Sequence, residues 1–134
     1  MLSTSSDGRS WSAPRPVSPG AAGLDRFTPA IAAAGGKVYI SYRMRAMSGT
    51  APTVSEDLIV SRDSGHTFGP ERQIGPPAVL AFAAVADTST TAFLGDYMGL
   101  AATRQLVALA WCVSSPPPVT EPYHQLLWGA TMGG

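Results

Sequence analysis

The chain has 134 residues, of which 45% are apolar and 13% are charged, with nine basic and nine acidic side chains. That length and apolar content suffice for the core of one ordinary domain, so disorder is not the default expectation. The balanced charge provides no strong field to attract nucleic acid or anionic lipid. We therefore expect no nucleic-acid partner.

Membrane, export and metal features are missing from the sequence. No apolar run approaches the roughly 20 residues that a membrane-spanning helix needs. The N-terminal segment MLSTSSDGRSW has neither a basic n-region nor an apolar h-region. Only one cysteine is present, and no histidines and carboxylates stand at ligand spacing. We expect no membrane span, no signal peptide in this chain, no metal and no cofactor.

Turn-forming residues divide the chain into short segments. Twelve prolines and fourteen glycines are typical of short strands joined by frequent turns, so the composition predicts an all-β fold. The sequence between these turns predicts strands at 30–34, 37–43, 57–62, 71–74, 100–103, 106–113 and 125–130. Gly35 and Gly36 predict a tight hairpin between the first two strands, because both residues adopt positive φ readily.

The segment 106–113, LVALAWCV, is apolar without alternation. As a strand it would need cover on both faces, and stacked sheets would provide that cover. A buried helix is the competing interpretation. β-Branched and aromatic residues with flanking turn residues favour the strand.

An internal repeat emerges when the chain is shifted by a constant 69 positions, as from Ile31 to Leu100. The shift also places apolar residues onto apolar residues in the predicted hairpin and in a later strand. The matching pairs are Val38 with Val107, Ile40 with Leu109, Tyr42 with Trp111, Leu58 with Leu127 and Ile59 with Trp128. The repeat predicts successive copies of one antiparallel unit.

The segment 61–68, SRDSGHTF, combines a serine, an aspartate, a glycine, a threonine and an aromatic residue at fixed spacing. An aspartate at a hairpin tip accepts backbone N–H groups that the strand ladder cannot reach, and glycine adopts conformations barred to other residues. We interpret this motif as a structural staple whose aromatic ring fills the gap between sheets. Its residues are Ser61, Asp63, Gly65, Thr67 and Phe68.

A second copy of the motif, SSDGRSW at 5–11, is one residue shorter. It retains Ser5, Asp7, Gly8 and Trp11, and we expect the same structural role. Its shorter spacing leaves the geometry of this turn open.

The motif resembles the Asp-box of the sialidase and BNR-repeat family. The phrases FLGDYMGLAA and PYHQLLWGAT also resemble terminal segments of bacterial sialidase-like proteins. The resemblance implies a β-propeller in which the box joins the third and fourth strands of a blade. It predicts one partial propeller over residues 1–134, with about two to three four-stranded antiparallel blades. The blade ends lie near 1–20, 27–76 and 93–134.

About two and a half blades cannot form a ring, because propellers close with roughly four to eight. The simplest explanation is that further blades belong to a longer parent chain, and self-association is the alternative. The resemblance also suggests a secreted or extracytoplasmic location.

The resemblance places a sialidase active site on the face opposite the Asp-box turns. The candidate loops there are 45–56, 75–97 and 114–124. Enzymes of this family use a tyrosine nucleophile activated by a glutamate, an aspartate acid/base and three arginines that grip a carboxylate. The implied catalytic candidates are Tyr97, Asp96 and Glu56, and the implied substrate-binding candidates are Arg26, Arg43, Arg45, Tyr123 and His124.

These candidates also have structural interpretations. Arg43 and Arg45 could instead be solvated charges at a strand end, and His124 could be a hydrogen-bonded residue at the rim. No arginine-isoleucine-proline motif of the family is present. Two functions therefore stay open. One is an exo-glycosidase acting on sialic-acid-type glycans, and the other is a non-catalytic propeller that binds glycan or protein through the same face.

Overall fold

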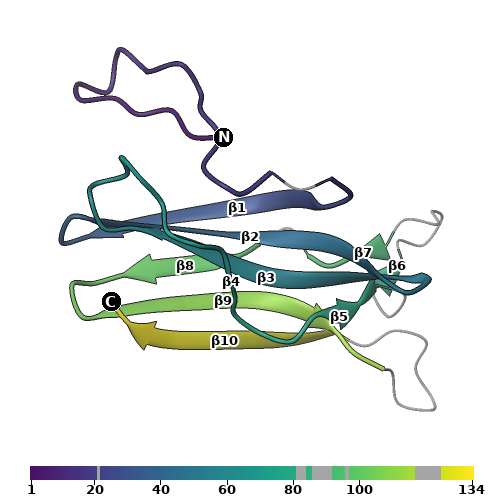
Figure 1. Cartoon of the computed structure of the whole chain (residues 1–134). Helices are drawn as coiled ribbons and strands as arrows, with labels where there is room; N and C mark the ends of the chain where they lie inside the picture. Colours follow the sequence, from purple (N-terminus) through teal and green to yellow (C-terminus); the bar gives the residue numbers. More distant parts are fainter. Residues whose placement is uncertain (21, 81–83, 86–91, 96, 117–124) are drawn as a thin grey trace.

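The computed structural model describes residues 1–134 apart from 21, 81–83, 86–91, 96 and 117–124. The described residues are all-β: they form antiparallel sheets, no α-helix and no closed sheet. Two sheets lie one above the other, and the N-terminal segment lies over the outer face of the first (Figure 1). None of the described residues belongs to a helix long and apolar enough to span a membrane.

The first sheet is an antiparallel meander. Its main strands are β1 (Asp25–Ala34), β2 (Lys37–Ser48), β3 (Ala51–Ser61) and β4 (Arg72–Gln73), in that order, and β5 (Ala78–Val79) pairs with the other end of β3. The β1–β2 turn consists of Gly35 and Gly36, with φ of 59° and 80°. Both values suit the turn that matches the twist of paired strands. The predicted hairpin is confirmed.

The predicted loop 45–56 is wrong, because most of it is strand. β2 and β3 continue in unbroken register from Val38 opposite Ser61 to Ser48 opposite Ala51. Only Gly49 and Thr50 form the turn, and Gly49 has a φ of 61°. The polar residues Thr53, Ser55 and Glu56 belong to this predicted loop, but in the structure they lie on the two faces of a long hairpin. The strands of this sheet are therefore longer than the sequence predicted.

The second sheet contains β8 (Gly99–Ala102), β9 (Leu106–Ser114) and β10 (Gln125–Gly133), in the order β10-β9-β8. A short pair, β6 (Ala84–Val85) and β7 (Ala92–Phe93), was not predicted. The 69-residue repeat holds for two strands, since Ile31 pairs with Ile40 as Leu100 pairs with Leu109.

The third strand of the repeat is shifted. Ile40 pairs with Ile59, whereas its counterpart Leu109 pairs with Ala130 rather than with Trp128. The predicted match of Leu58 with Leu127 is therefore out of register by two residues. A shift of two preserves the face on which each side chain lies, because the side-chain period of a strand is two.

The main core lies between the two sheets. Tyr39 and Leu58 from the first sheet meet an alternating row from β9, and Leu58 is fully buried. The row consists of Val107, Leu109, Trp111 and Val113. The opposite face of the first sheet has its own core of Ile40, Tyr42 and Ile59, covered in part by Leu2, Val17 and Phe68. The central sheet is therefore covered on both faces.

The expectation that 106–113 is covered on both faces is wrong for this structure. Burial alternates along β9, and only the side facing the first sheet is buried. Ala108, Ala110 and Cys112 on the other side are half-buried, and Leu127, which pairs with Cys112, is 79% exposed. Small residues produce the continuous apolar pattern without requiring a second covering layer.

Replacing Leu58 with alanine tests the core between the sheets. Because this side chain is fully buried, Leu58→Ala should lower the free energy of unfolding by about 2–5 kcal/mol. Leu127→Ala is the matched control, and its exposed side chain should change stability by less than about 0.5 kcal/mol. Urea unfolding of both variants measures the difference. Equal effects would contradict the packing of the two sheets.

Candidate functional site

The loop after β3, residues 61–68, resembles an Asp-box and is held by hydrogen bonds among its own residues. Ser61 Oγ donates to Asp63 Oδ1 at 2.7 Å and accepts the Gly65 N–H at 2.8 Å. The Asp63 carboxylate also accepts the N–H of Thr67 at 2.8 Å and its hydroxyl at 2.5 Å. These hydrogen bonds hold the pKa of Asp63 well below its usual value. Each of these hydrogen bonds lies within the turn itself.

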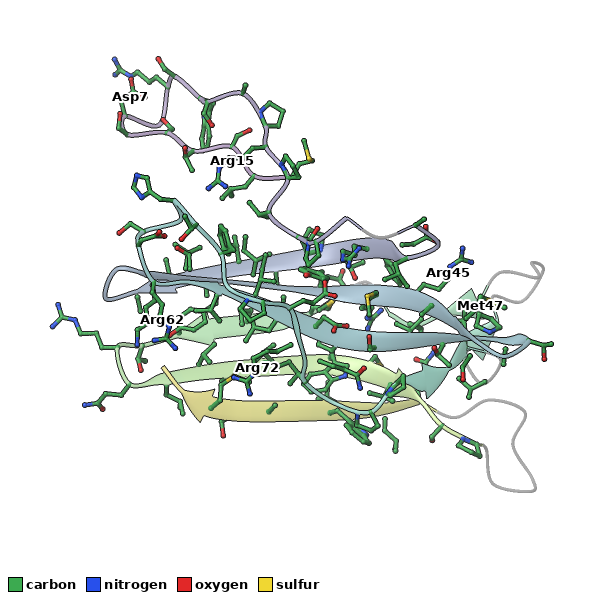
Figure 2. The ribbon with its side chains drawn as sticks, viewed as in Figure 1. Asp7, Arg15, Arg45, Met47, Arg62 and Arg72 are labelled. Atoms are coloured by element: carbon green, nitrogen blue, oxygen red, sulfur yellow. The ribbon has the colours of Figure 1, made fainter. Side chains whose placement is uncertain are left out.

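The shorter N-terminal copy forms the same arrangement. Ser5 Oγ donates to Asp7 Oδ1 at 3.0 Å and accepts the Gly8 N–H at 2.8 Å. Asp7 Oδ1 also accepts the N–H groups of Arg9 and Ser10, both at 2.8 Å, and these bonds lower the pKa of Asp7 to about 2. Although this copy of the motif is one residue shorter, its carboxylate still accepts backbone N–H groups. Figure 2 shows the position of Asp7 in the N-terminal segment.

The aromatic residues of the two boxes differ in position. Phe68 packs against the core formed by Ile40, Tyr42 and Ile59. Trp11 is 64% exposed and does not fill a gap between described sheets. The ring of Trp11 therefore departs from the expected role.

The candidates predicted from the loop face do not converge on one site. Asp96, Tyr123 and His124 lie outside the described residues. Tyr97 is 92% exposed, and Arg45 pairs with Asp25 on the surface. Three candidates remain in structured surroundings: Arg43 and Glu56 on the face toward the second sheet, and Arg26 on the opposite face.

Arg43 is a buried anchor between the sheets. It is 2% exposed and donates to the carbonyl oxygens of Leu94, Gly95 and Cys112 at 3.1, 2.9 and 3.3 Å. A guanidinium that satisfies several backbone acceptors at once ties the first sheet to the β7–β8 segment and to β9. Both terminal nitrogens of Arg43 are therefore engaged by the protein itself.

Glu56 lies directly opposite Arg43 in the β2–β3 ladder. It is also 2% exposed, and neither carboxylate oxygen has a hydrogen-bond partner among the described residues. Burial raises the pKa of Glu56 to about 7. The Ser41 hydroxyl and the Arg43 charge act in the opposite direction, although Ser41 does not complete a hydrogen bond to the carboxylate.

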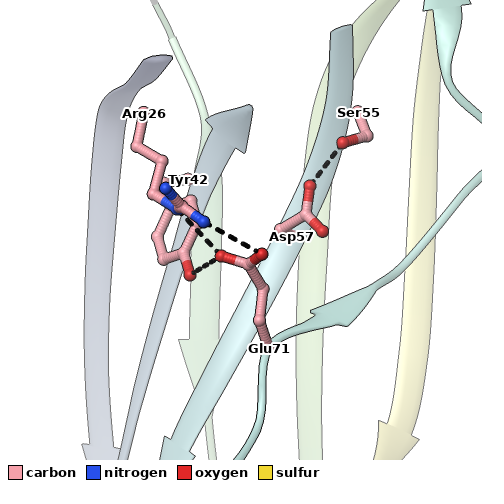
Figure 3. Close-up of polar contacts among 5 residues, drawn as sticks. All are labelled: Arg26, Tyr42, Ser55, Asp57 and Glu71. Carbon is pink, nitrogen blue, oxygen red and sulfur yellow. Dashed lines mark hydrogen bonds and ion pairs between the residues drawn. The ribbon is translucent and has the colours of Figure 1, made fainter. Parts of the chain in front are cut away.

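A second polar cluster, which we name the tyrosine cluster, lies on the other face of the first sheet (Figure 3). Glu71 receives two bonds from the Arg26 guanidinium, at 2.9 and 3.2 Å, and one from the Tyr42 hydroxyl at 2.5 Å. Burial acts to raise the pKa of Glu71, but the bonds from Arg26 and Tyr42 outweigh it, and the pKa is lowered. Burial and the bond to Glu71 raise the pKa of Tyr42.

Asp57 completes the tyrosine cluster from β3. It lies opposite Tyr42 in the ladder and accepts a short hydrogen bond from Ser55. Burial raises the pKa of Asp57, the nearby charge of Glu71 raises it further, and Ser55 and Arg26 oppose the rise. The cluster thus holds two carboxyl groups whose pKa values are pushed in opposite directions.

A cleft of about 110 Å³ opens beside the tyrosine cluster. Arg26, Tyr42 and Ser18 supply its polar lining, and its apolar lining is Met1, Val17, Phe27, Pro29 and Ile40. An apolar recess with a few convergent polar groups is the usual form of a small-ligand site. This cleft is the best-formed candidate site among the described residues.

Sequence reasoning identified Arg26 but missed Tyr42, Asp57 and Glu71. Tyr42 was counted only as an apolar repeat position, and Glu71 only as a strand residue. The available signal was the run Ser55, Glu56 and Asp57 between apolar residues of one strand, which indicates buried polar groups on both faces. Within the described part of the chain, no group of three or more histidine, cysteine and carboxylate side chains is arranged to hold a metal ion.

Comparison of the chain with protein-family models, curated proteins and solved structures gave no significant match.

The buried carboxyl of Glu56 predicts a stability loss on alkalinisation. Its pKa is higher in the folded state than the usual 4.5, so the folded state retains a proton that the unfolded chain releases. The contribution is complete below pH 4.5 and is lost as the pH rises through about 7. Urea unfolding at pH 4.8 and pH 8.0 should show a fall of roughly 2–3 kcal/mol. Glu56→Gln should remove most of this fall, and an unchanged fall would contradict the assignment.

The Asp63 carboxylate predicts the reverse dependence at lower pH. Its folded-state pKa is depressed, so its stabilising effect is present above about pH 4 and is lost as the pH falls further. Asp63→Ala should lower the thermal midpoint at pH 7 and flatten its decline between pH 4.5 and 2.5. Arg62→Ala, an exposed neighbour, serves as the control. Identical acid profiles for wild type and Asp63→Ala would refute a stapling role.

Proposed function

We propose that this chain forms blades of a sialidase-like Asp-box β-propeller that binds sialic-acid-type glycans, and that hydrolysis is the activity of the complete propeller. The observation that carries the proposal is the pair of Asp-box loops with matching hydrogen bonds. In each loop a serine bridges the aspartate and the glycine N–H, and the aspartate collects donors further along the turn.

The arrangement of the sheets supports the same proposal. The Asp-box loop follows the third strand of a four-stranded meander, as in the family. The first sheet packs on both sides, against the second sheet and against the segment that carries the other box. Successive blades of a propeller would form sheets that repeat along the chain and pack face to face. Further blades would be needed to close a ring.

The cleft beside the tyrosine cluster is the proposed glycan contact. Phe27 and Pro29 offer apolar surface. Arg26 has N–H donors beyond the two that it gives to Glu71, and the Tyr42 oxygen, whose O–H is given to Glu71, can accept. Sialidases use groups of the same types: a tyrosine that is bonded to a carboxylate, an arginine, and a further carboxyl group. In the tyrosine cluster the pKa of this further carboxyl group is raised. Paired carboxyls with separated pKa values suit acid and base roles.

A non-catalytic propeller is the second candidate, and a specific observation favours it. The Arg26 fork is occupied by Glu71, and Arg43 donates to three backbone carbonyls, so neither presents an open fork to a substrate carboxylate. The raised pKa of Tyr42 also opposes its use as a nucleophile. In this case the cleft would bind glycan without turnover.

Binding and hydrolysis of sialosides test the proposal. Titration of the chain with 3′-sialyllactose, followed by NMR, should give saturable shifts at cleft residues, whereas lactose should give none. Arg26→Gln should weaken this binding at least about tenfold, because it removes a charged donor. Arg72→Gln, an exposed arginine outside the cleft, should leave it unchanged.

Release of sialic acid from a fluorogenic sialoside separates the two candidates. Turnover that Tyr42→Phe or Tyr97→Phe abolishes favours the glycosidase. Binding without turnover favours the non-catalytic propeller. Absence of both would contradict the proposed function.

A further inference from the structure

The two Asp-box loops are joined to each other by an arginine. Arg15 follows the N-terminal box, and two backbone hydrogen bonds to Leu2 fix its position. The Leu2 N–H donates to the Arg15 carbonyl at 2.8 Å, and the Arg15 N–H donates to the Leu2 carbonyl at 3.0 Å. Its guanidinium donates a short hydrogen bond to the carbonyl oxygen of Gly65 in the other box. Figure 2 shows Arg15 between the N-terminal hairpin and the rest of the molecule. The residue therefore bridges the two boxes.

An open cleft of about 210 Å³ lies at this bridge. It is lined by Thr4 and Arg15 on the N-terminal side and by Ser64, Gly65 and His66 on the other. Arg26 and Arg45 each pair with a carboxylate, but Arg15 has no ion-pair partner among the described residues. A guanidinium has five N–H donors, and the bond to Gly65 uses one of them. The charge and most of the fork remain available to a ligand.

The other cleft residues suit the same kind of ligand. His66 Nδ1 lies 2.5 Å from the carbonyl oxygen of Asp63, and because a carbonyl only accepts, Nδ1 must carry the proton. Nε2 is then free to accept when the ring is neutral and to donate when it is protonated. The hydroxyl of Ser64, which also lines the cleft, adds a further donor, while the Thr4 hydroxyl already donates to Ser12 Oγ at 3.4 Å.

The carboxylate of Asp63, next to the cleft residue Ser64 in the chain, is engaged by its own loop. It accepts bonds from Ser61 and Thr67. It forms no ion pair with Arg15.

We propose that the cleft between the two Asp-box loops is a binding site for an oxyanion, either a carboxylate or a sulfate group of a ligand, held by the Arg15 fork and His66. A planar guanidinium matches two oxygens of such a group at once. This site is separate from the cleft beside the tyrosine cluster and does not depend on sialoside binding there.

Titration of the full chain with sodium sulfate and with sodium glucuronate, followed by NMR, tests the site. Each is compared with sodium chloride at equal ionic strength. Saturable shifts at the amides of Thr4, Ser64 and Gly65 support the site, and the ratio of the two affinities shows which oxyanion fits better. Arg15→Lys should weaken binding at least about tenfold, because lysine retains the charge but loses the fork. Arg9→Lys, at the tip of the same hairpin and outside the cleft, is the matched control.

His66 provides a second readout that a structural role of Arg15 would not produce. His66→Ala should weaken sulfate binding several-fold, because the variant loses the ring that lines the cleft while Arg15 is unchanged. Shifts that are identical with chloride, or equal losses in the Arg15 and Arg9 variants, would overturn the proposal.

Discussion

The structure depends on one contact, the packing of β9 onto the first sheet. A row of alternating large side chains on β9 lies against Tyr39 and Leu58, and the result is the largest core of the molecule. Burial of apolar surface is the main favourable term in folding, so this interface positions most of the remaining contacts. The other face of the first sheet depends in turn on the N-terminal segment, through Leu2 and Val17.

Polar groups interrupt both cores at the same height of the sheet. Arg43 and Glu56 face one side and Tyr42 and Asp57 face the other, because neighbouring residues of a strand alternate between faces. Burial of unpaired charge is costly, and the structure reduces this cost in two ways. The terminal nitrogens of Arg43 donate to backbone carbonyls, while burial favours the neutral form of Glu56.

Much of the fold could be predicted from the sequence because turn chemistry and apolar spacing are local signals. The glycine pair predicted the first hairpin, and the repeat predicted a second antiparallel unit, which β8 and β9 form. The length of β2 and β3 could not be predicted, since Thr53, Ser55 and Asp57 are polar residues whose burial depends on partners distant in the sequence. The two-residue shift of β10 also depends on pairing that no local pattern fixes.

The candidate site was less predictable than the fold. Arg26 was predicted as a binding residue, but Glu71, which holds it, lies 45 positions later, directly before β4. Asp-box chemistry was readable because each box is a local turn, whereas the contact of Arg15 with Gly65 spans 50 positions and leaves no signal in either segment. Side chains that meet across sheets require the three-dimensional arrangement.

Methyl NOE measurements would test the central arrangement most directly. If the first sheet is covered on both faces, Leu58 and its neighbour Ile59 must contact different partners. The structure predicts that Leu58 methyls show NOEs to the β9 row and that Ile59 methyls show NOEs to the group containing Leu2, Val17 and Phe68. Shared partners for the two residues, or no NOEs between the sheets, would contradict it.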